Sequence, residues 1–87
     1  MDIDTGSWKK LFGMWPDGMA RRGVLVTAFG EQIPFSGFSA ASAMLLLERQ
    51  TPDSLGARMV IVSYDQIVAL KITEVVKFSA FRSLGFE

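Results

Sequence analysis

The sequence predicts a small, mainly β protein, in which an N-terminal α-helix is followed by a five-stranded, strongly bent antiparallel sheet closed as a small barrel. Residues 58–72 contain two apolar runs rich in Val, Ile and Leu, joined by a short polar insert at 63–66. Such residues favour strands because they pack well on a pleated, half-buried surface. Three more short apolar runs precede this stretch, and helical spacing of apolar residues occurs before all of them.

The composition excludes several classes of protein. With 87 residues the chain forms one domain, and its 49% hydrophobic content is enough for a core with some apolar surface left for a partner chain. Nine basic and nine acidic residues give no net charge, which argues against bulk electrostatic coating of nucleic acid. Without Cys or His, disulfides, thiolate nucleophiles, imidazole bases and the usual zinc sites are excluded, and we expect neither cofactor nor metal.

The cellular location follows from the N-terminus and the hydropathy pattern. The chain starts with an acidic segment unlike a signal peptide. No apolar run approaches the roughly 20 residues that a membrane helix needs. We therefore expect a cytoplasmic protein that does not enter a membrane.

An amphipathic helix is predicted after a flexible N-terminus of residues 1–6. Ser7 can cap this helix, and Pro16 ends it. Its apolar face has the spacing i, i+3, i+4, i+7, which is filled by Trp8, Leu11, Phe12 and Trp15. The two Trp residues either cover one open end of the barrel or form a platform on which bases stack.

Five strands are then predicted. The first two run over 23–29 and 32–38, where Pro34 demands an edge or a bulge and Gly37 indicates a sharp bend. The third strand is placed at 44–49, although Ala, Met and Leu leave a helix over 39–50 as an alternative. A loop at 50–56 leads to strands at about 58–63 and 67–72. Residues 7–73 thus form the barrel domain, and the tail at 74–87 is either a short helix or an extended segment.

This order of features resembles the Sm-like family, which comprises the Sm and Lsm proteins and the bacterial Hfq ring. The first family motif is similar to residues 24–30 with Ile33 and Gly37, and the second to residues 60–68. The resemblance spans about residues 7–73 and implies a homo-oligomeric ring joined through strands four and five. Strands that are apolar on both faces are covered on both faces, which independently favours another subunit as one cover. The interface would then contain Met59, Val60, Ile61, Val62, Val68, Leu70 and Ile72.

The chain departs from the family where RNA is recognised. The Asp and Asn that Sm proteins use around strand three have no match in residues 39–44. The Arg-Gly type of turn is replaced by residues 63–66, and the Lys-His pair of Hfq is missing. Recognition of uridine therefore does not carry over residue by residue, and RNA binding follows only by analogy of fold.

Candidate RNA-binding residues lie in two predicted loops and one basic segment. Tyr64, Asp65 and Gln66 form the turn before strand five, and in an Sm-like ring they converge at the pore with the loop of Ser39 and Ser42. Tyr64 either stacks on a base whose edge Gln66 reads, or simply packs the turn. The basic concentration that could hold phosphates comprises Lys9, Lys10, Arg21 and Arg22.

Catalysis is not expected. General acid–base chemistry would depend on carboxylates such as Glu31, Glu48, Asp65 and Glu74, and their spacing does not pair them. The glycines form no phosphate-binding loop and no nucleophile elbow. The sequence therefore predicts an Sm-like oligomeric ring that binds single-stranded RNA or, alternatively, serves as a structural or protein-interaction module without nucleic acid.

Overall fold

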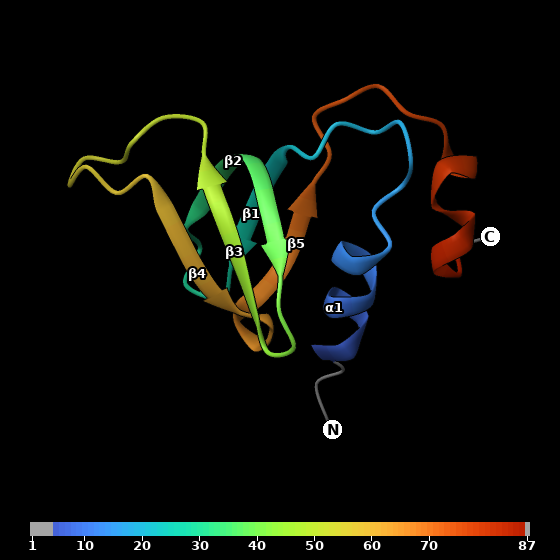
Figure 1. The fold of residues 1–87 in the computed structure, drawn as a ribbon, viewed down its shortest axis with the longest axis horizontal. Coiled ribbons are helices and arrows are strands. Elements are labelled where there is room, and N and C mark those ends of the chain that lie inside the picture. Colours follow the sequence, from blue (N-terminus) through green and yellow to red (C-terminus); the bar gives the residue numbers. More distant parts are fainter. Residues whose placement is uncertain (1–4, 87) are drawn as a thin grey trace.

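The computed structural model describes residues 5–86, which form one antiparallel sheet with a helix at each end of the chain (Figure 1). The elements in chain order are α1 (Thr5–Gly13), β1 (Gly23–Thr27), β2 (Gln32–Ala40), β3 (Met44–Arg49), β4 (Met59–Ser63), the 3₁₀ turn η1 (Tyr64–Gln66), β5 (Ile67–Lys71) and the 3₁₀ helix η2 (Phe78–Leu84). Most of the flexible N-terminus predicted at 1–6 lies outside the described residues, although Thr5 and Gly6 already belong to α1.

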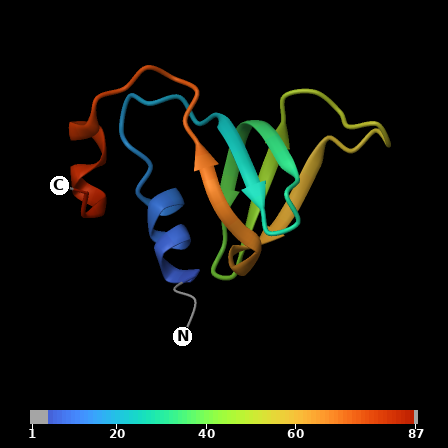
Figure 2. The same ribbon diagram turned by 180° about the vertical axis from the view of Figure 1, so that it is seen from behind.

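The sheet is open. Its strand order is β4-β3-β2-β1-β5, so β4 and β5 form the two edges and are not paired with each other. The predicted closure into a barrel is therefore not found in residues 5–86. The edge strands β4 and β5 follow each other through η1 without pairing (Figures 1 and 2). The core is covered by α1 instead, whose Phe12 is fully buried in it.

The core lies between the concave face of the sheet and α1. Its fully buried side chains are Phe12, Leu25, Ile33, Phe35, Leu45 and Leu47. Phe12 projects from α1 into this cluster, with its ring stacked on Trp15 at 5.8 Å and edge-on to Phe38 at 5.0 Å. Trp8 and Trp15 both pack against the cluster, so they cover the core of an open sheet and not the end of a barrel.

The long strand β2 bends at Gly37, as predicted. Its register with β3 shifts between Phe35 and Gly37, and the strand curves across the sheet (Figure 1). Of the two places expected for Pro34, the edge is not found, because β2 is a central strand, but Pro34 directly precedes the bulge-like register shift between Phe35 and Gly37. Pro34 is tolerated because the backbone N and C=O of one strand residue face the same side. The Pro34 carbonyl accepts from the Gln50 N–H at 3.4 Å, so the nitrogen of Pro34 also faces the side of β3. The β2–β3 ladder ends at the Phe35–Arg49 pair, so no ladder bond needs an N–H from Pro34.

Three other expectations are settled by the described chain. Residues 44–49 form a strand and not the alternative helix, and β2 extends to Ala40, which leaves only residues 41–43 as a turn. The tail forms the short helix of the two options, and it ends at Gly85, which has a left-handed conformation. Within residues 5–86, each helix is too short or too polar to cross a lipid bilayer.

The loop between β3 and β4 is organised by Asp53. The Asp53 Oδ1 atom accepts from the backbone N–H groups of Leu55 and Ala57, both at 2.9 Å. These bonds, from Ala57 first and Leu55 second, lower the pKa of the Asp53 carboxyl below its usual value because they favour the charged form. Gly56 completes the loop with a φ of +86°, which only glycine adopts readily.

Candidate functional site

The first part of the candidate site is the unpaired edge of β4. The Arg49 N–H donates to Arg58 O at 2.9 Å, so the backbone of Arg58, just before β4, faces β3. Because backbone direction alternates along a strand, Val60 and Val62 also face β3. The N–H and C=O groups of Met59, Ile61 and Ser63 therefore face the open edge.

The side chains on this edge are apolar and accessible. Met59 is 58% exposed and Ile61 is 65% exposed, and they pair on β3 with Glu48 and Leu46, respectively. β4 has the sequence MVIVS, without the Lys or Pro residues that natural proteins place on an edge to prevent pairing with another chain. Val62 instead belongs to the protein's own core, and Val60 packs against that core.

The second open edge is β5, which pairs only with β1. Its register with β1 shifts between Val26 and Thr27, and Val68, at this irregularity, is 58% exposed. Leu70 packs partly against the core, and Ile72 follows the end of the strand. The seven predicted interface residues thus lie on or next to the two edge strands, and their role in assembly stays a prediction.

The third part is a pair of neighbouring turns, residues 41–43 and 64–66, which we call the turn pair. The Tyr64 hydroxyl donates to the Ala41 carbonyl at 2.7 Å, and the Tyr64 N–H donates to Ala43 O at 3.4 Å. Tyr64 is only 3% exposed, and this burial raises the pKa of its hydroxyl. Its ring therefore packs the turn and leaves no open face for a base. Ser42 and Asp65 are exposed beside it, and Gln66 is half-buried.

The remaining predicted RNA-binding residues are not gathered at the turn pair. Arg21 and Arg22 immediately precede β1, and the start of β1 pairs with the end of β5 through Val24 and Lys71. The turn η1 lies at the other end of β5, where this strand begins. The Arg21 guanidinium lies 4.2 Å from the centre of the Phe38 ring, an attractive cation–π geometry. Ser39 is exposed within β2, opposite Leu46.

One feature was missed by sequence reasoning, a mainly apolar cavity of about 560 Å³ where α1, the end of β5 and the tail meet. The signal was present in the spacing of Phe78, Phe81 and Leu84. A 3₁₀ helix has three residues per turn, so this spacing places all three on one face. We call this cavity the tail groove.

Comparisons of the chain with protein-family models, with curated proteins and with solved structures found no match.

Proposed function

We propose that this protein assembles head to tail into a closed homo-oligomeric ring, with β4 of one copy paired to β5 of the next. The observation that carries the proposal is the pair of unlike open edges, both with accessible apolar side chains. An unpaired edge strand is a template for pairing with another chain. The Sm-like resemblance of residues 7–73 supports the same assembly.

The unlike edges favour a ring over a dimer. Pairing β4 with β5 joins two different surfaces, and such a contact repeats until the rotation between copies closes a ring. Pairing β4 with β4 would instead make a two-fold dimer and leave both β5 edges open. The ring is therefore the assembly that uses every edge of every copy.

The proposal is tested by a proline on the open side of β4. Ile61→Pro removes a backbone N–H that faces away from β3, so the fold keeps its own ladder while the edge loses a donor. Ile61→Ala is the matched control, because it shortens the same side chain and retains the N–H. We expect native mass spectrometry to show a closed oligomer for the wild type and for Ile61→Ala, and a folded monomer for Ile61→Pro. A monomeric wild type at micromolar concentration contradicts the proposal, and a dimer points to β4–β4 pairing.

The turn pair favours a second function, binding of single-stranded RNA. It presents Ser42, Asp65 and Gln66 together, and a ring would repeat these polar groups around its axis. Loops of this kind can read the edges of unstacked bases. Tyr64 would not stack on a base, because its ring is buried, and bulk charge would not attract RNA, because the net charge is zero.

RNA binding is tested on gently purified protein at low salt. If RNA is bound, the oligomer carries additional mass that ribonuclease removes, and Gln66→Ala lowers the affinity for short single-stranded RNA in fluorescence anisotropy. Ser36→Ala, an exposed position in β2, is the control and leaves the affinity unchanged. A ring of bare protein, with no affinity for RNA, supports the structural or protein-interaction module instead.

A further inference from the structure

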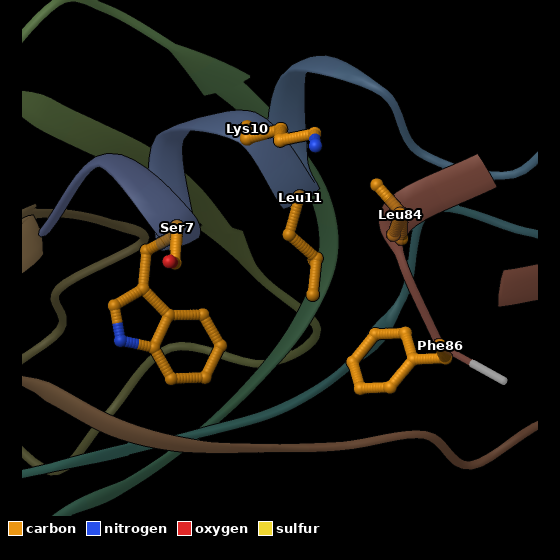
Figure 3. A pocket seen from close by; sticks show the side chains of 6 residues that line it. Ser7, Lys10, Leu11, Leu84 and Phe86 are labelled. Atoms are coloured by element: carbon orange, nitrogen blue, oxygen red, sulfur yellow. The ribbon is translucent and has the colours of Figure 1, made fainter. Parts of the chain in front are cut away.

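The tail groove is a concave apolar site built by three elements. α1 contributes Trp8 and Leu11, the end of β5 contributes Leu70 and Ile72, and the tail contributes the rest of the lining, which comprises Phe78, Phe81, Arg82 and Phe86. A smaller cavity of about 300 Å³ adjoins it and shares Trp8, Leu11 and Phe86. Figure 3 shows this smaller cavity, with Leu11 and Phe86 facing each other and Lys10 extending toward Leu84.

The tail is anchored to the domain but does not close the groove. The Glu74 carboxylate accepts from the Ala20 N–H at 2.8 Å, which fixes the start of the tail against the loop before β1. Beyond this anchor, no residue of η2 is buried, and Phe78 is 93% exposed. The aromatic side chains of η2 thus form one wall of an open groove.

Among residues 5–86, the charged side chains that line the groove have one sign. Within this range, Arg82 is the only charged residue that lines the larger cavity, and Lys10 is the only one that lines the smaller cavity. No acidic side chain of residues 5–86 lines either of them. Ligand sites for small molecules are typically apolar clefts of about 300–1,000 Å³ with a few placed polar groups, and the tail groove fits this description.

We propose that the tail groove binds an aliphatic monocarboxylate, with the hydrocarbon chain between α1 and η2 and the carboxylate on Arg82. Burying the chain removes apolar surface of both partners from water, and a guanidinium can hold a carboxylate by two parallel hydrogen bonds. The cations at the groove select this chemistry over a cationic or uncharged amphiphile of equal length. A single copy of the chain supplies the whole lining of the tail groove, so binding does not require assembly into a ring.

The test is isothermal titration of the full-length protein with decanoate, and with decyltrimethylammonium as a cation of matched chain length. Arg82→Glu reverses the charge at the groove, whereas Lys77→Glu makes the same change at an exposed tail residue outside the lining. We expect one saturable decanoate site per chain and weaker binding of the cation. Arg82→Glu should lower the decanoate affinity about tenfold or more, as hydrogen bonds to charged groups do, while Lys77→Glu leaves the affinity within about twofold by the weak effect of exposed charges.

Three outcomes overturn the proposal. Equal affinity for decanoate and the cation shows a nonspecific apolar surface, and an equal loss in both variants shows a general charge effect without a role for Arg82. Absence of decanoate binding to a wild type with native circular dichroism rejects the site directly. If Phe81→Ser then reduces the oligomer size, the groove is occupied by a second copy of the chain.

Discussion

Replacing Tyr64 with Phe tests the hydrogen bond that joins the two turns of the turn pair. The variant retains the buried aromatic ring and removes only the hydroxyl, which donates to Ala41 O at 2.7 Å. A hydrogen bond of this kind contributes about 1 kcal/mol to stability. The cost stays near this value because Ala41 is exposed and its freed carbonyl can turn to water. Tyr64→Ala would instead open a cavity at a cost of about 3–5 kcal/mol, a large part of a small domain's stability.

The assay is urea unfolding monitored by the fluorescence of Trp8 and Trp15. With a slope of about 1 kcal/mol per molar urea for so small a protein, Tyr64→Phe should lower the midpoint by about 1 M. Both proteins are compared at two concentrations, because assembly makes apparent stability depend on concentration. Affinity for RNA should be unchanged by Tyr64→Phe, since the Tyr64 ring is buried and has no face open to a base. An unchanged midpoint would refute the bond between the two turns.

The same pair of proteins gives a pH dependence with a defined sign. Burial raises the pKa of the Tyr64 hydroxyl above its ordinary value of 10.0. The stability gained from the neutral hydroxyl is therefore complete below pH 10 and is lost as the pH rises through the raised pKa. The advantage of the wild type over Tyr64→Phe should shrink above pH 10. A constant difference between pH 8 and pH 12 would contradict the burial of the hydroxyl.

Three further substitutions test other parts of the fold. Gly23→Ala places a Cβ 2.7 Å from the Lys71 carbonyl oxygen, so we expect about 2 kcal/mol of destabilisation in urea unfolding, or no change if β1 and β5 can separate freely. Thr27→Val removes a buried hydroxyl that has no hydrogen-bond partner within residues 5–86, and it should raise the unfolding free energy by about 1 kcal/mol; a loss would reveal a bond to water. Asp53→Ala removes the acceptor of two loop bonds and should accelerate proteolysis between residues 50 and 58, whereas equal cleavage rates would show that the loop does not need it.

Local chemistry predicted most of the elements, and long-range contacts decided the rest. The bend at Gly37 followed from a single residue with a permissive backbone, whereas α1 ends at Gly13, before the Pro16 that was expected to end it. The choice between strand and helix for residues 44–49 could not be made locally, because three consecutive leucines fit either period. It is decided by pairing on both sides, where Leu45 and Leu47 turn inward and Leu46 turns outward.

The wrong expectation of a closed barrel has a long-range cause. Whether the sheet closes depends on whether β4 meets β5, and neither strand carries that information in its own residues. Pro34 was expected at an edge or a bulge because proline lacks a donor, and it lies in a central strand directly before the register shift, beyond the end of the β2–β3 ladder. For the candidate site, the approach of the two turns was predicted, but the burial of Tyr64 depends on Ala41, more than twenty residues away in the sequence.

The strand order has a consequence for how the chain is made. Strands β1 to β4 are successive neighbours and can pair as each leaves the ribosome, whereas β1 gains its second neighbour only when β5 emerges, after β2, β3 and β4. Contacts between distant parts of a chain form slowly because a long loop must be closed first. A nascent or truncated chain that ends before residue 67 therefore exposes the apolar flank of β1 as well as that of β4, and both flanks are then open to pairing with another chain.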